Sequence, residues 1–204
     1  MKKGYFITFE GVDGCGKTTQ LELLADYLRD ERDLAVIETR EPGAKGLGEK
    51  IREILLNYDG EVSSQCEAFL FLADRAQNID VIVNPAIRAN KIVLCDRHTD
   101  STVAYQGYGR GLDIEEINML NNIATRQRKP DLTIVFDIDI ETAMNRVGKD
   151  CDRMESSGKE FFNAVRNGYL TLAKMEPNRI KVVNAARSIE EIHKDVIKLF
   201  DELD

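Results

Sequence analysis

The residues with the most distinctive chemistry lie near the N-terminus, between positions 11 and 19. They read Gly-Val-Asp-Gly-Cys-Gly-Lys-Thr-Thr and fit the G-x-x-x-x-G-K-[ST] pattern of a phosphate-binding loop. Glycine lets successive backbone N–H groups approach phosphate oxygens because it has no Cβ. Lys17 is expected to reach the β- and γ-phosphates, and the Thr18 hydroxyl can bind Mg²⁺. The pattern predicts a nucleotide phosphate site made of Gly11, Val12, Asp13, Gly14, Cys15, Gly16, Lys17, Thr18 and Thr19.

A second group of charged residues follows an apolar run at positions 91–95. The run is continuously hydrophobic, which is typical of a central parallel strand, and it ends in Asp96, Arg97 and His98. A carboxylate beside the phosphate loop can hold Mg²⁺ directly or through water. The adjacent arginine can bind a phosphate through two parallel hydrogen bonds. His98 has no metal-ligating companion nearby in the sequence, so no role follows for it.

Three further segments hold candidate binding residues. Arg40 follows a short strand and is either a phosphate contact or a solvated charge. Phe71 and Arg75 are one helical turn apart and could hold a base between them, although periodicity by itself favours packing for Phe71. Residues 101–111 are polar and glycine-rich, with two tyrosines. This composition predicts a segment that lines a cleft and is not a core element.

The elements that position these residues alternate along the chain. Strands are expected at 5–9, 35–39, 91–95, 130–137 and 180–184; helices are expected after the phosphate loop and at 46–56, 65–89 (one helix, or two with a break near Pro85), 114–124, 141–147, 161–173 and 189–203. The alternation predicts an α/β fold, a P-loop NTPase-type parallel β-sheet flanked by helices on both faces. In the helix at 46–56, the side chains expected to face inward are Leu47, Ile51, Ile54 and Leu55.

The charged run at about 147–158 is bounded by glycines and nearly lacks apolar anchors. It is either a solvated loop or a short mobile lid that brings Arg146, Lys149 and Arg153 over a transferring phosphate.

Composition limits the class of protein. The chain has 204 residues, a hydrophobic content of 43%, a charged content of 31% and a formal net charge of −8. These values predict one globular domain over 1–204, with no nucleic-acid partner, because phosphate backbones require a basic surface. No apolar run is long enough to cross a membrane, and no signal peptide precedes the first strand, so a cytoplasmic location is expected. The four scattered cysteines are expected as free thiols.

Taken together, the motifs resemble those of the thymidylate (dTMP) kinase family of the bacterial type over nearly the whole chain. The motifs are Phe-Glu-Gly-Val-Asp-Gly at 9–14, Thr-Arg-Glu-Pro-Gly at 39–43, Phe-Leu-Ala-Asp-Arg at 71–75, Asp-Arg-His at 96–98, Ala-Tyr-Gln-Gly at 104–107, Arg-Gly at 110–111 and Lys-Pro-Asp-Leu at 129–132. The resemblance implies transfer of the γ-phosphoryl group of MgATP to dTMP, giving dTDP and ADP, by a homodimer.

The resemblance also implies roles for individual residues. On the donor side, Lys17 and Thr18 match the positions for ATP phosphate and Mg²⁺, with Asp96 beside the metal and Arg146 packed on adenine. On the acceptor side, Asp13 matches the carboxylate that holds the 3′-hydroxyl, and Arg97 the arginine on the dTMP phosphate, with Arg40 beside it. Phe71 resembles the ring that stacks on thymine, against the packing expectation, and Arg75 the side chain that hydrogen-bonds the base. Ser101, Thr102, Tyr105 and Gln106 match positions that line base and sugar, where Tyr105 would crowd a ribose 2′-hydroxyl.

Three positions separate this chain from other members of that family. Gly14 stands where some members place a catalytic arginine, so this chain resembles the subclass that supplies positive charge from the lid, through Arg146, Lys149 and Arg153. Residues 44–46 read Ala-Lys-Gly in place of a Gly-Thr-Pro-like run, and His98 replaces a Tyr or Phe.

Two alternative functions remain open at this stage. One is another nucleoside monophosphate kinase, acting on UMP, CMP or AMP. The other is a P-loop ATPase that acts on a protein partner. The absence of an Asn-Lys-x-Asp run disfavours a GTPase.

Overall fold

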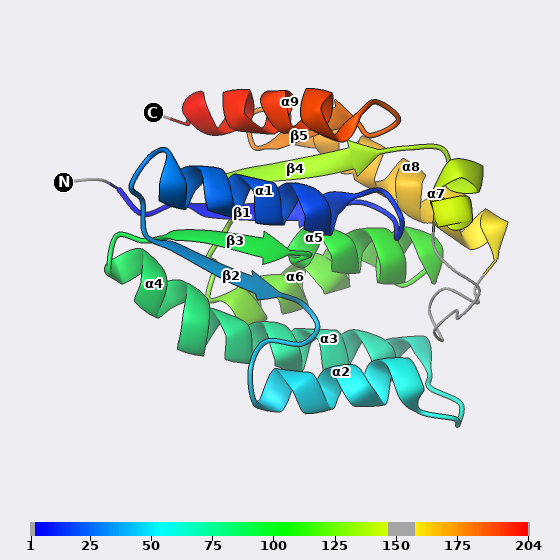
Figure 1. Cartoon of the computed structure of the whole chain (residues 1–204). Coiled ribbons are helices and arrows are strands. Elements are labelled where there is room, and N and C mark those ends of the chain that lie inside the picture. Colours follow the sequence, from blue (N-terminus) through cyan, green and yellow to red (C-terminus); the bar gives the residue numbers. More distant parts are fainter. Residues whose placement is uncertain (1–2, 147–157, 204) are drawn as a thin grey trace.

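Five parallel strands form the centre of the structure, a computed structural model that describes residues 3–146 and 158–203 (Figure 1). The strands are β1 (Phe6–Glu10), β2 (Val36–Arg40), β3 (Ile92–Asp96), β4 (Leu132–Asp137) and β5 (Ile180–Asn184). They lie in the order β2-β3-β1-β4-β5, and each neighbouring pair is parallel. The α/β fold with a parallel sheet, expected from the alternation of elements, is confirmed.

Helices cover both faces of this sheet. They are α1 (Lys17–Asp30), α2 (Leu47–Asn57), α3 (Ser64–Asn78), the π-helical segment η1 (Ile79–Val83), α4 (Asn84–Arg88), α5 (Thr99–Thr102), the π-helical segment η2 (Val103–Gly109), α6 (Ile114–Thr125), α7 (Ile140–Arg146), α8 (Lys159–Met175) and α9 (Ile189–Asp201). Helices α1 and α9 pack against each other on one face, whereas α4 and α8 contact strands from the other face (Figure 1). Helix α2 packs on α3, farther from the sheet.

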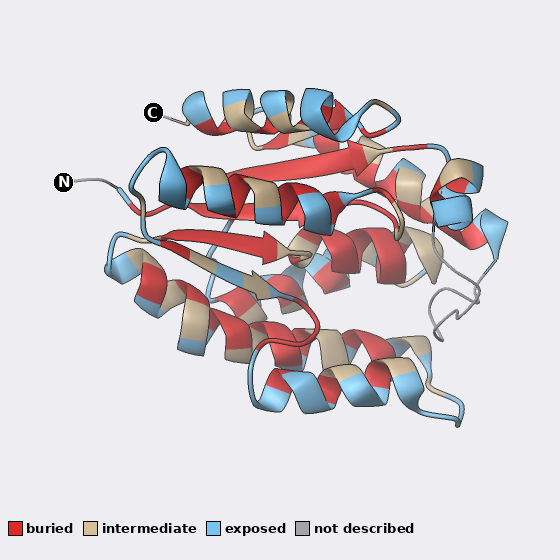
Figure 2. Ribbon diagram, in the orientation of Figure 1, coloured by how far each residue is buried: buried red, intermediate tan, exposed pale blue. Residues whose placement is uncertain are grey.

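The side chains of β1 explain why both faces must be covered. Every residue of this strand is buried, because β1 lies in the middle of the sheet (Figure 2). Ile7 and Phe9 join the large apolar cluster that includes Leu24 of α1, whereas Phe6 packs with Ile79. Successive strand residues point to opposite faces, so a strand with every residue buried must lie between two layers of helices.

One segment differs in part from the sequence-based expectation. Residues 101–111 were expected to line a cleft and not to form a core element. Ser101, Thr102, Tyr105 and Gln106 do line a pocket, but most of the segment is helical, in α5 and η2, and Ser101 to Gly107 are buried. Their polar groups can be buried because other side chains bind them, as described below. The helical stretch at 65–89, expected as one helix or as two with a break near Pro85, runs through α3, η1 and α4 without a break at Pro85, as in the first alternative. The helix tolerates Pro85 because this residue lies in the first turn of α4, after the π-helical segment η1.

Helix α2 buries a narrower face than predicted. Ile51 and Leu55 are buried, as expected, but Leu47 and Ile54 are about half exposed, at 52% and 47%. Because α2 packs on α3 and does not lie directly on the sheet, only one narrow stripe of its surface is covered.

The lid expected at 147–158 lies outside the described residues, except for Gly158. In the described part of the chain, no helix combines the length and the apolar character needed to span a bilayer.

Candidate active site

The carboxyl ends of β1 and β3 bring the two charged motifs together. The strands are neighbours, and their register pairs Phe9 with Asp96. The phosphate-binding loop leaves β1 at the same edge of the sheet at which Arg97 follows β3 (Figure 1). Parallel pairing therefore places residues 80 or more positions apart in the sequence side by side, at the edge where open α/β sheets bind ligands.

The loop after β1 requires glycine at its first position. Gly11 has a φ of 142°, and a Cβ there would lie 2.8 Å from the backbone oxygen of Phe136 and from Cys15 Sγ. Gly16, with a φ of 91°, precedes the first residue of α1. The loop thus turns directly into a helix whose N-terminal N–H groups and dipole favour an anion.

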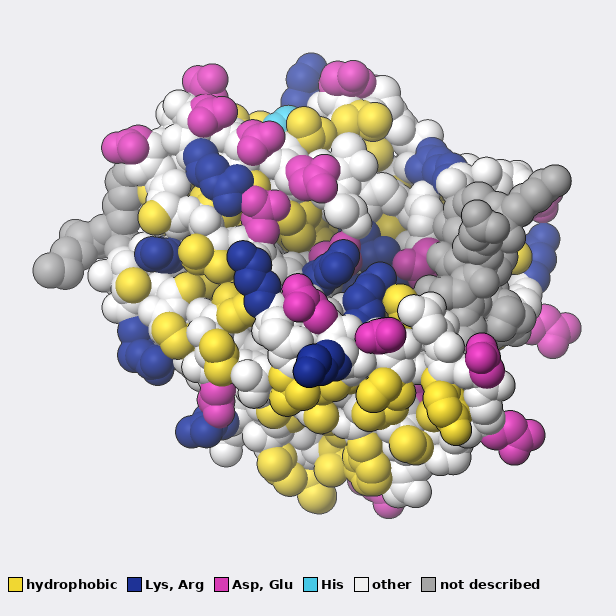
Figure 3. Space-filling view, turned by 60° about the horizontal axis from the view of Figure 1, so that its bottom comes forward, with side chains coloured by type: hydrophobic (Ala, Val, Ile, Leu, Met, Phe, Trp, Pro, Cys, Tyr) yellow, Lys and Arg dark blue, Asp and Glu magenta, His cyan; other side chains and the backbone are white. Residues whose placement is uncertain are grey.

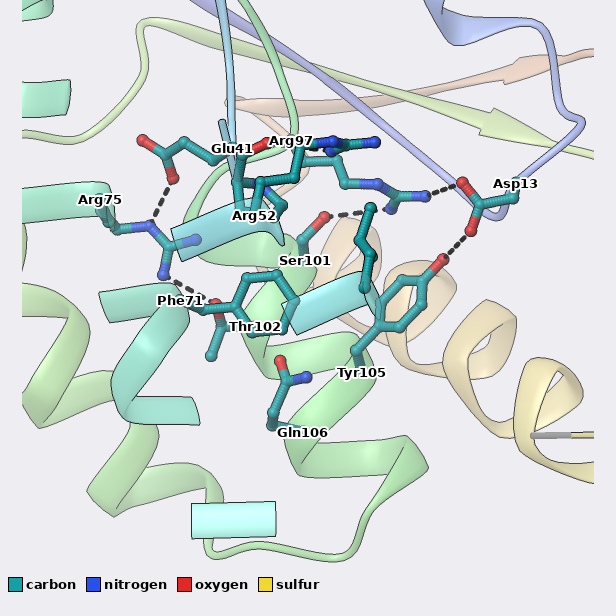
Figure 4. A pocket seen from close by; sticks show the side chains of 12 residues that line it. Asp13, Glu41, Arg52, Phe71, Arg75, Arg97, Ser101, Thr102, Tyr105 and Gln106 are labelled. Carbon is teal, nitrogen blue, oxygen red and sulfur yellow. Dashed lines mark hydrogen bonds and ion pairs between the residues drawn. The ribbon is translucent and has the colours of Figure 1, made fainter. Parts of the chain in front are cut away.

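Lys17 and Arg97 both contact the carboxylate of Asp13. Asp13 Oδ1 lies 3.4 Å from Lys17 Nζ. The same oxygen lies 2.7 Å from Arg97 Nη2 (Figure 4). Burial by itself would raise the pKa of the Asp13 carboxyl, but the charges of Arg97 and Lys17 outweigh it and hold that pKa well below its ordinary value. The site therefore holds an ionised carboxylate between two cations that come from different strand ends.

Asp96 and Thr18 form a contact suited to a divalent cation. The Thr18 hydroxyl donates a hydrogen bond of 2.7 Å to Asp96 Oδ2. Asp96 Oδ1 is buried and has no hydrogen-bond partner among the described residues. A carboxylate oxygen left without a donor fits a hard cation. The described residues contain no group of three or more His, Cys, Asp or Glu side chains that could hold a metal.

A pocket opens beside this charged centre. It is lined by Asp13, Glu41, Pro42, Arg52, Leu56, Phe71, Arg75, Arg97, Ser101, Thr102, Tyr105 and Gln106 (Figure 4). The Phe71 ring stands at the pocket between Arg75 and Tyr105. One end of the pocket is thus positively charged, through Arg52 and Arg97, and the other is aromatic and amide-lined. This arrangement suits a flat polar ring that carries an anionic group.

Arg75 lies at the aromatic end of the pocket in a cage of acceptors. Its Nε donates to Glu41 Oε2 at 2.8 Å, and its Nη2 donates to the backbone oxygen of His98 at 2.8 Å. Its Nη1 donates to Thr102 Oγ1 and to Asn121 Oδ1, each at 2.7 Å. The guanidinium is almost fully buried, and these contacts fix its plane relative to the pocket.

Comparison with known proteins identifies the family that shares these features. A sequence model described as thymidylate kinase matches residues 9–196. A thymidylate kinase of Pelotomaculum thermopropionicum is 48% identical to this chain, over 98% of this chain and 94% of that protein. A thymidylate kinase of Fervidobacterium nodosum is 44% identical, over 96% of this chain and 98% of that protein. The chain belongs to the thymidylate kinase family.

The fold and enzyme class agree with this membership. The crystal structure of a thymidylate kinase from Ehrlichia chaffeensis is similar, with a TM-score of 0.82 and 38% identity, covering 98% of this chain and 99% of that one. The resemblance to thymidylate kinases inferred from the motifs is thereby confirmed, and with it the enzyme class, a dTMP kinase.

The structure brings most of the predicted thymidylate kinase residues to the pocket or to the loop beside it. Tyr105 is buried; its hydroxyl lies 3.3 Å from Asp13 Oδ2, and the Arg97 guanidinium lies over its ring at 4.9 Å. The Gln106 amide donates to Glu67 Oε1 at 2.9 Å. Arg40 is exposed and lines the wider cleft that contains Lys17 and Thr18, not the pocket itself.

Two of the predicted site residues lie at the end of a described part of the chain or outside the described residues. Arg146 is the last residue of α7, and its Nη1 donates to the backbone oxygen of Ala185 at 3.4 Å, so it joins α7 to the loop after β5. Arg153 lies outside the described residues.

Sequence reasoning missed several residues of this thymidylate kinase site. Arg52 lines both the pocket and the wider cleft, and its Nη1 donates to the Pro42 backbone oxygen at 3.0 Å. Glu41 and Asn121 hold Arg75. Glu41 could have been noticed, since it lies inside the quoted motif at 39–43. Arg52 and Asn121 stand in ordinary amphipathic helices, where their types and spacing carry no signal.

Glu10 is a hydrogen-bond acceptor for the segment that follows Arg97 and for Tyr169. It accepts hydrogen bonds from the backbone N–H of His98 at 2.7 Å, from Ser101 Oγ at 2.5 Å and from the Tyr169 hydroxyl at 3.0 Å. Burial and the charge of Asp100 raise the pKa of the Glu10 carboxyl to about 7. These bonds explain how Ser101 can be buried although it lies in a polar segment.

Asp74 supports the loop that follows β2 and is expected to make stability depend on pH. Its Oδ1 accepts a 3.2 Å hydrogen bond from the Gly43 N–H, and its Oδ2 is buried with no partner among the residues described. Burial, followed by the charge of Glu41, raises the pKa of the Asp74 carboxyl from 3.8 to about 6. The folded state therefore binds this proton more tightly than the unfolded state does.

The resulting contribution to stability is complete below about pH 4 and is lost as the pH rises through about 6. We expect the free energy of unfolding of the parent protein to fall between pH 4.5 and pH 7.5 by about 2 kcal/mol more than that of Asp74→Asn, because the amide cannot ionise. Urea unfolding at the two pH values measures this difference. Equal pH dependence in both proteins would show that Asp74 is not the responsible group.

Proposed function

We propose that this protein transfers the γ-phosphoryl group of MgATP to the 5′-phosphate of dTMP, with the residues above in defined roles. The observation that carries the proposal is the convergence of Lys17 and Arg97 on Asp13, beside the pocket that contains Phe71 and Arg75. Lys17 belongs to a nucleotide phosphate loop, and Arg97 lines a pocket for a flat ring. Two phosphates can therefore meet between them.

On the donor side, the backbone N–H groups from Gly11 to Thr19 bind the ATP phosphates, and Lys17 neutralises the charge of the migrating phosphoryl group. Burial by itself would lower the pKa of Lys17, and the Arg97 charge acts in the same direction, but Asp13 and Asp96 reverse the effect, so that its pKa is raised and it stays charged. Phosphoryl transfer needs in-line positioning and positive charge more than covalent help from the protein.

On the acceptor side, Arg97 and Arg52 bind the dTMP phosphate, with Arg40 at the wider cleft. Phe71 stacks on the base; its place at the pocket supports this role over simple packing. Asp13 accepts a hydrogen bond from the 3′-hydroxyl once phosphates have taken over its cations. Tyr105 excludes a 2′-hydroxyl. Ser101, Thr102 and Gln106 line the remaining walls.

Mg²⁺ fits the Thr18 and Asp96 pair, since Asp96 Oδ1 lacks a donor among the described residues. Mg²⁺ held there by Thr18 and Asp96 would neutralise part of the phosphate charge. We assign the adenine contact to Arg146. This residue ends α7, which follows β4, whereas Arg97 follows β3 on the other side of β1. Arg153 and Lys149 are proposed to close over the transferring phosphate and exclude water.

A coupled ADP-release assay tests this function. MgATP is supplied with dTMP, dUMP, UMP, CMP or AMP, beside a reaction without acceptor and one with EDTA in excess over the metal. We expect turnover to be concentrated on dTMP and to disappear with EDTA. Preference for a ribonucleotide would overturn the roles of Tyr105 and Phe71, and equal ADP release without acceptor would indicate an ATPase.

We also propose that the protein is a homodimer. Exposed large apolar side chains include Leu47 and Ile54 of α2, Phe69 of α3, and Met119 and Ile123 of α6. Hydrophobic side chains gather on the face that carries α2 and α3 (Figure 3). Exposed apolar patches of this kind mark protein interfaces. Light scattering of the purified protein gives the mass that decides this proposal.

A further inference from the structure

Arg75 has one unused hydrogen bond to offer within the described residues. A guanidinium carries five N–H bonds, and the acceptors on Glu41, Thr102, Asn121 and His98 take four of them. The remaining N–H is on Nη2. Because Arg75 also lines the pocket, the four internal bonds decide where this last donor points. The residues that hold those acceptors in place therefore control the direction of the donor.

Glu41 is the charged partner in this cage, and it is itself held at three points. Its Oε2 accepts from Arg75, its Oε1 accepts from Asn78 Nδ2 at 2.8 Å, and His98 Nδ1 lies 3.0 and 3.1 Å from the two oxygens. Burial by itself would raise the pKa of the Glu41 carboxyl, but His98 and Arg75 lower it to about 2. Glu41 is therefore an ionised carboxylate, which can only accept hydrogen bonds.

His98 must consequently carry a proton on Nδ1. Its side chain is fully buried, and its ring packs edge-to-face against Phe6, with the centroids 5.0 Å apart. Nε2 has no hydrogen-bond partner among the described residues. Glu41 is thus the one polar contact of this imidazole in the described structure. The backbone of the same residue accepts from Arg75 Nη2, so residue 98 holds the Glu41–Arg75 pair from two sides.

We propose that the His98 side chain is a positioning residue for base selection. Its Nδ1–H fixes the Glu41 carboxylate, and Glu41 in turn fixes the free N–H of Arg75 toward the base. A fixed N–H donates a hydrogen bond to a carbonyl oxygen, which thymine and uracil present at position 4, but it has no acceptor for the amino group that cytosine presents there. This inference rests on the proposed function, because it concerns selection among pyrimidine nucleoside monophosphates at the same pocket.

Three substitutions separate the hydrogen bond from the bulk of the ring. His98→Phe keeps a flat ring against Phe6 but removes the donor. His98→Asn places an amide N–H near the position of Nδ1, whereas His98→Gln places it near the position of Nε2. The measurements are the KM for dTMP, kcat, and the inhibition constant of dCMP against dTMP. All are taken well below the melting temperature of each variant, so that loss of stability does not enter.

For His98→Phe we expect the KM for dTMP to rise about tenfold, the value of one charge-assisted hydrogen bond, with kcat changed less than about threefold. The inhibition constant of dCMP should move by less than about threefold, so the preference for thymine over cytosine narrows by several-fold. His98→Asn should retain most of the preference, and His98→Gln should lose it.

An unchanged preference in His98→Phe, or an equal loss in His98→Asn and His98→Gln, would overturn the proposal. If His98→Phe fails to fold, the comparison of the two amide variants decides. Failure of the parent protein to phosphorylate dTMP would instead contradict the proposed function, and the assay on the parent protein detects that outcome separately.

Discussion

Replacement of Lys17 by methionine is expected to lower kcat for dTMP phosphorylation about a thousandfold, while the KM for dTMP stays within about threefold of the parent value. Lys17 is buried at the start of α1, and its ammonium lies 3.4 Å from Asp13. A buried cation next to the phosphate loop stabilises the negative charge that shifts during phosphoryl transfer. Water cannot take the place of this cation. The pocket proposed for dTMP is lined by Asp13 and Arg97 but not by Lys17.

Steady-state kinetics with MgATP and dTMP measure this effect. The matched control is Lys194→Met, which removes an exposed lysine from α9 and leaves the site intact. Circular dichroism shows whether the Lys17 variant is folded; Asp13 retains Arg97 as its partner, so the fold should persist. A variant with parent-like kcat and a raised KM for dTMP would mean that Lys17 binds the acceptor and not the migrating group.

The second large effect is on stability and concerns Arg75→Met. Arg75 and Glu41 form an ion pair in which each side chain is 1% exposed. Removal of one partner leaves a buried charge without compensation, which typically lowers the free energy of unfolding by about 3–5 kcal/mol. Thr102 and Asn121 would also lose a donor. We therefore expect Arg75→Met to be the more destabilising of these two substitutions, and to abolish selection of the base.

A double-mutant cycle separates the charge from the packing. Glu41→Gln removes the carboxylate charge but keeps a side chain of the same length. Its amide oxygen can still accept from Asn78 Nδ2, and its amide nitrogen is a donor where the carboxylate had an acceptor. We expect the double variant Glu41→Gln/Arg75→Met to recover roughly 1–2 kcal/mol relative to Arg75→Met, measured by urea unfolding. Additive effects of the two substitutions would show that the pair contributes through packing only.

The expectations that proved accurate rest on short-range patterns. The phosphate loop is a contiguous motif whose glycines, lysine and threonine act through the backbone geometry of a few residues. The strand at 180–184 was predicted at its observed bounds, and the other strands within two residues at either end. Residues 101–111 line the pocket as predicted, but their burial was not foreseen, because composition reports how polar a segment is and not what its polar groups bind. Ser101 is buried on Glu10 and Tyr169, which are far from it in the chain.

Phe71 shows the limit of periodicity. Its spacing in the helix suits a core position as well as a binding face, and only the neighbours that fold beside it decide between the two. In the structure it lines the pocket with Arg75 and Tyr105. The family resemblance predicted this placement, whereas the helical pattern favoured packing.

The sequence by itself determined the α/β fold and the family, because residue type, local spacing and the order of motifs are enough to specify them. Only the tertiary structure decided how the pocket is held: that Asp13 joins Lys17 to Arg97, that Asn121 reaches Arg75, and that His98 faces Glu41. Each of these contacts joins side chains from different elements at hydrogen-bond distance. A hydrogen bond requires a separation near 3 Å and a suitable angle, which no one-dimensional pattern encodes.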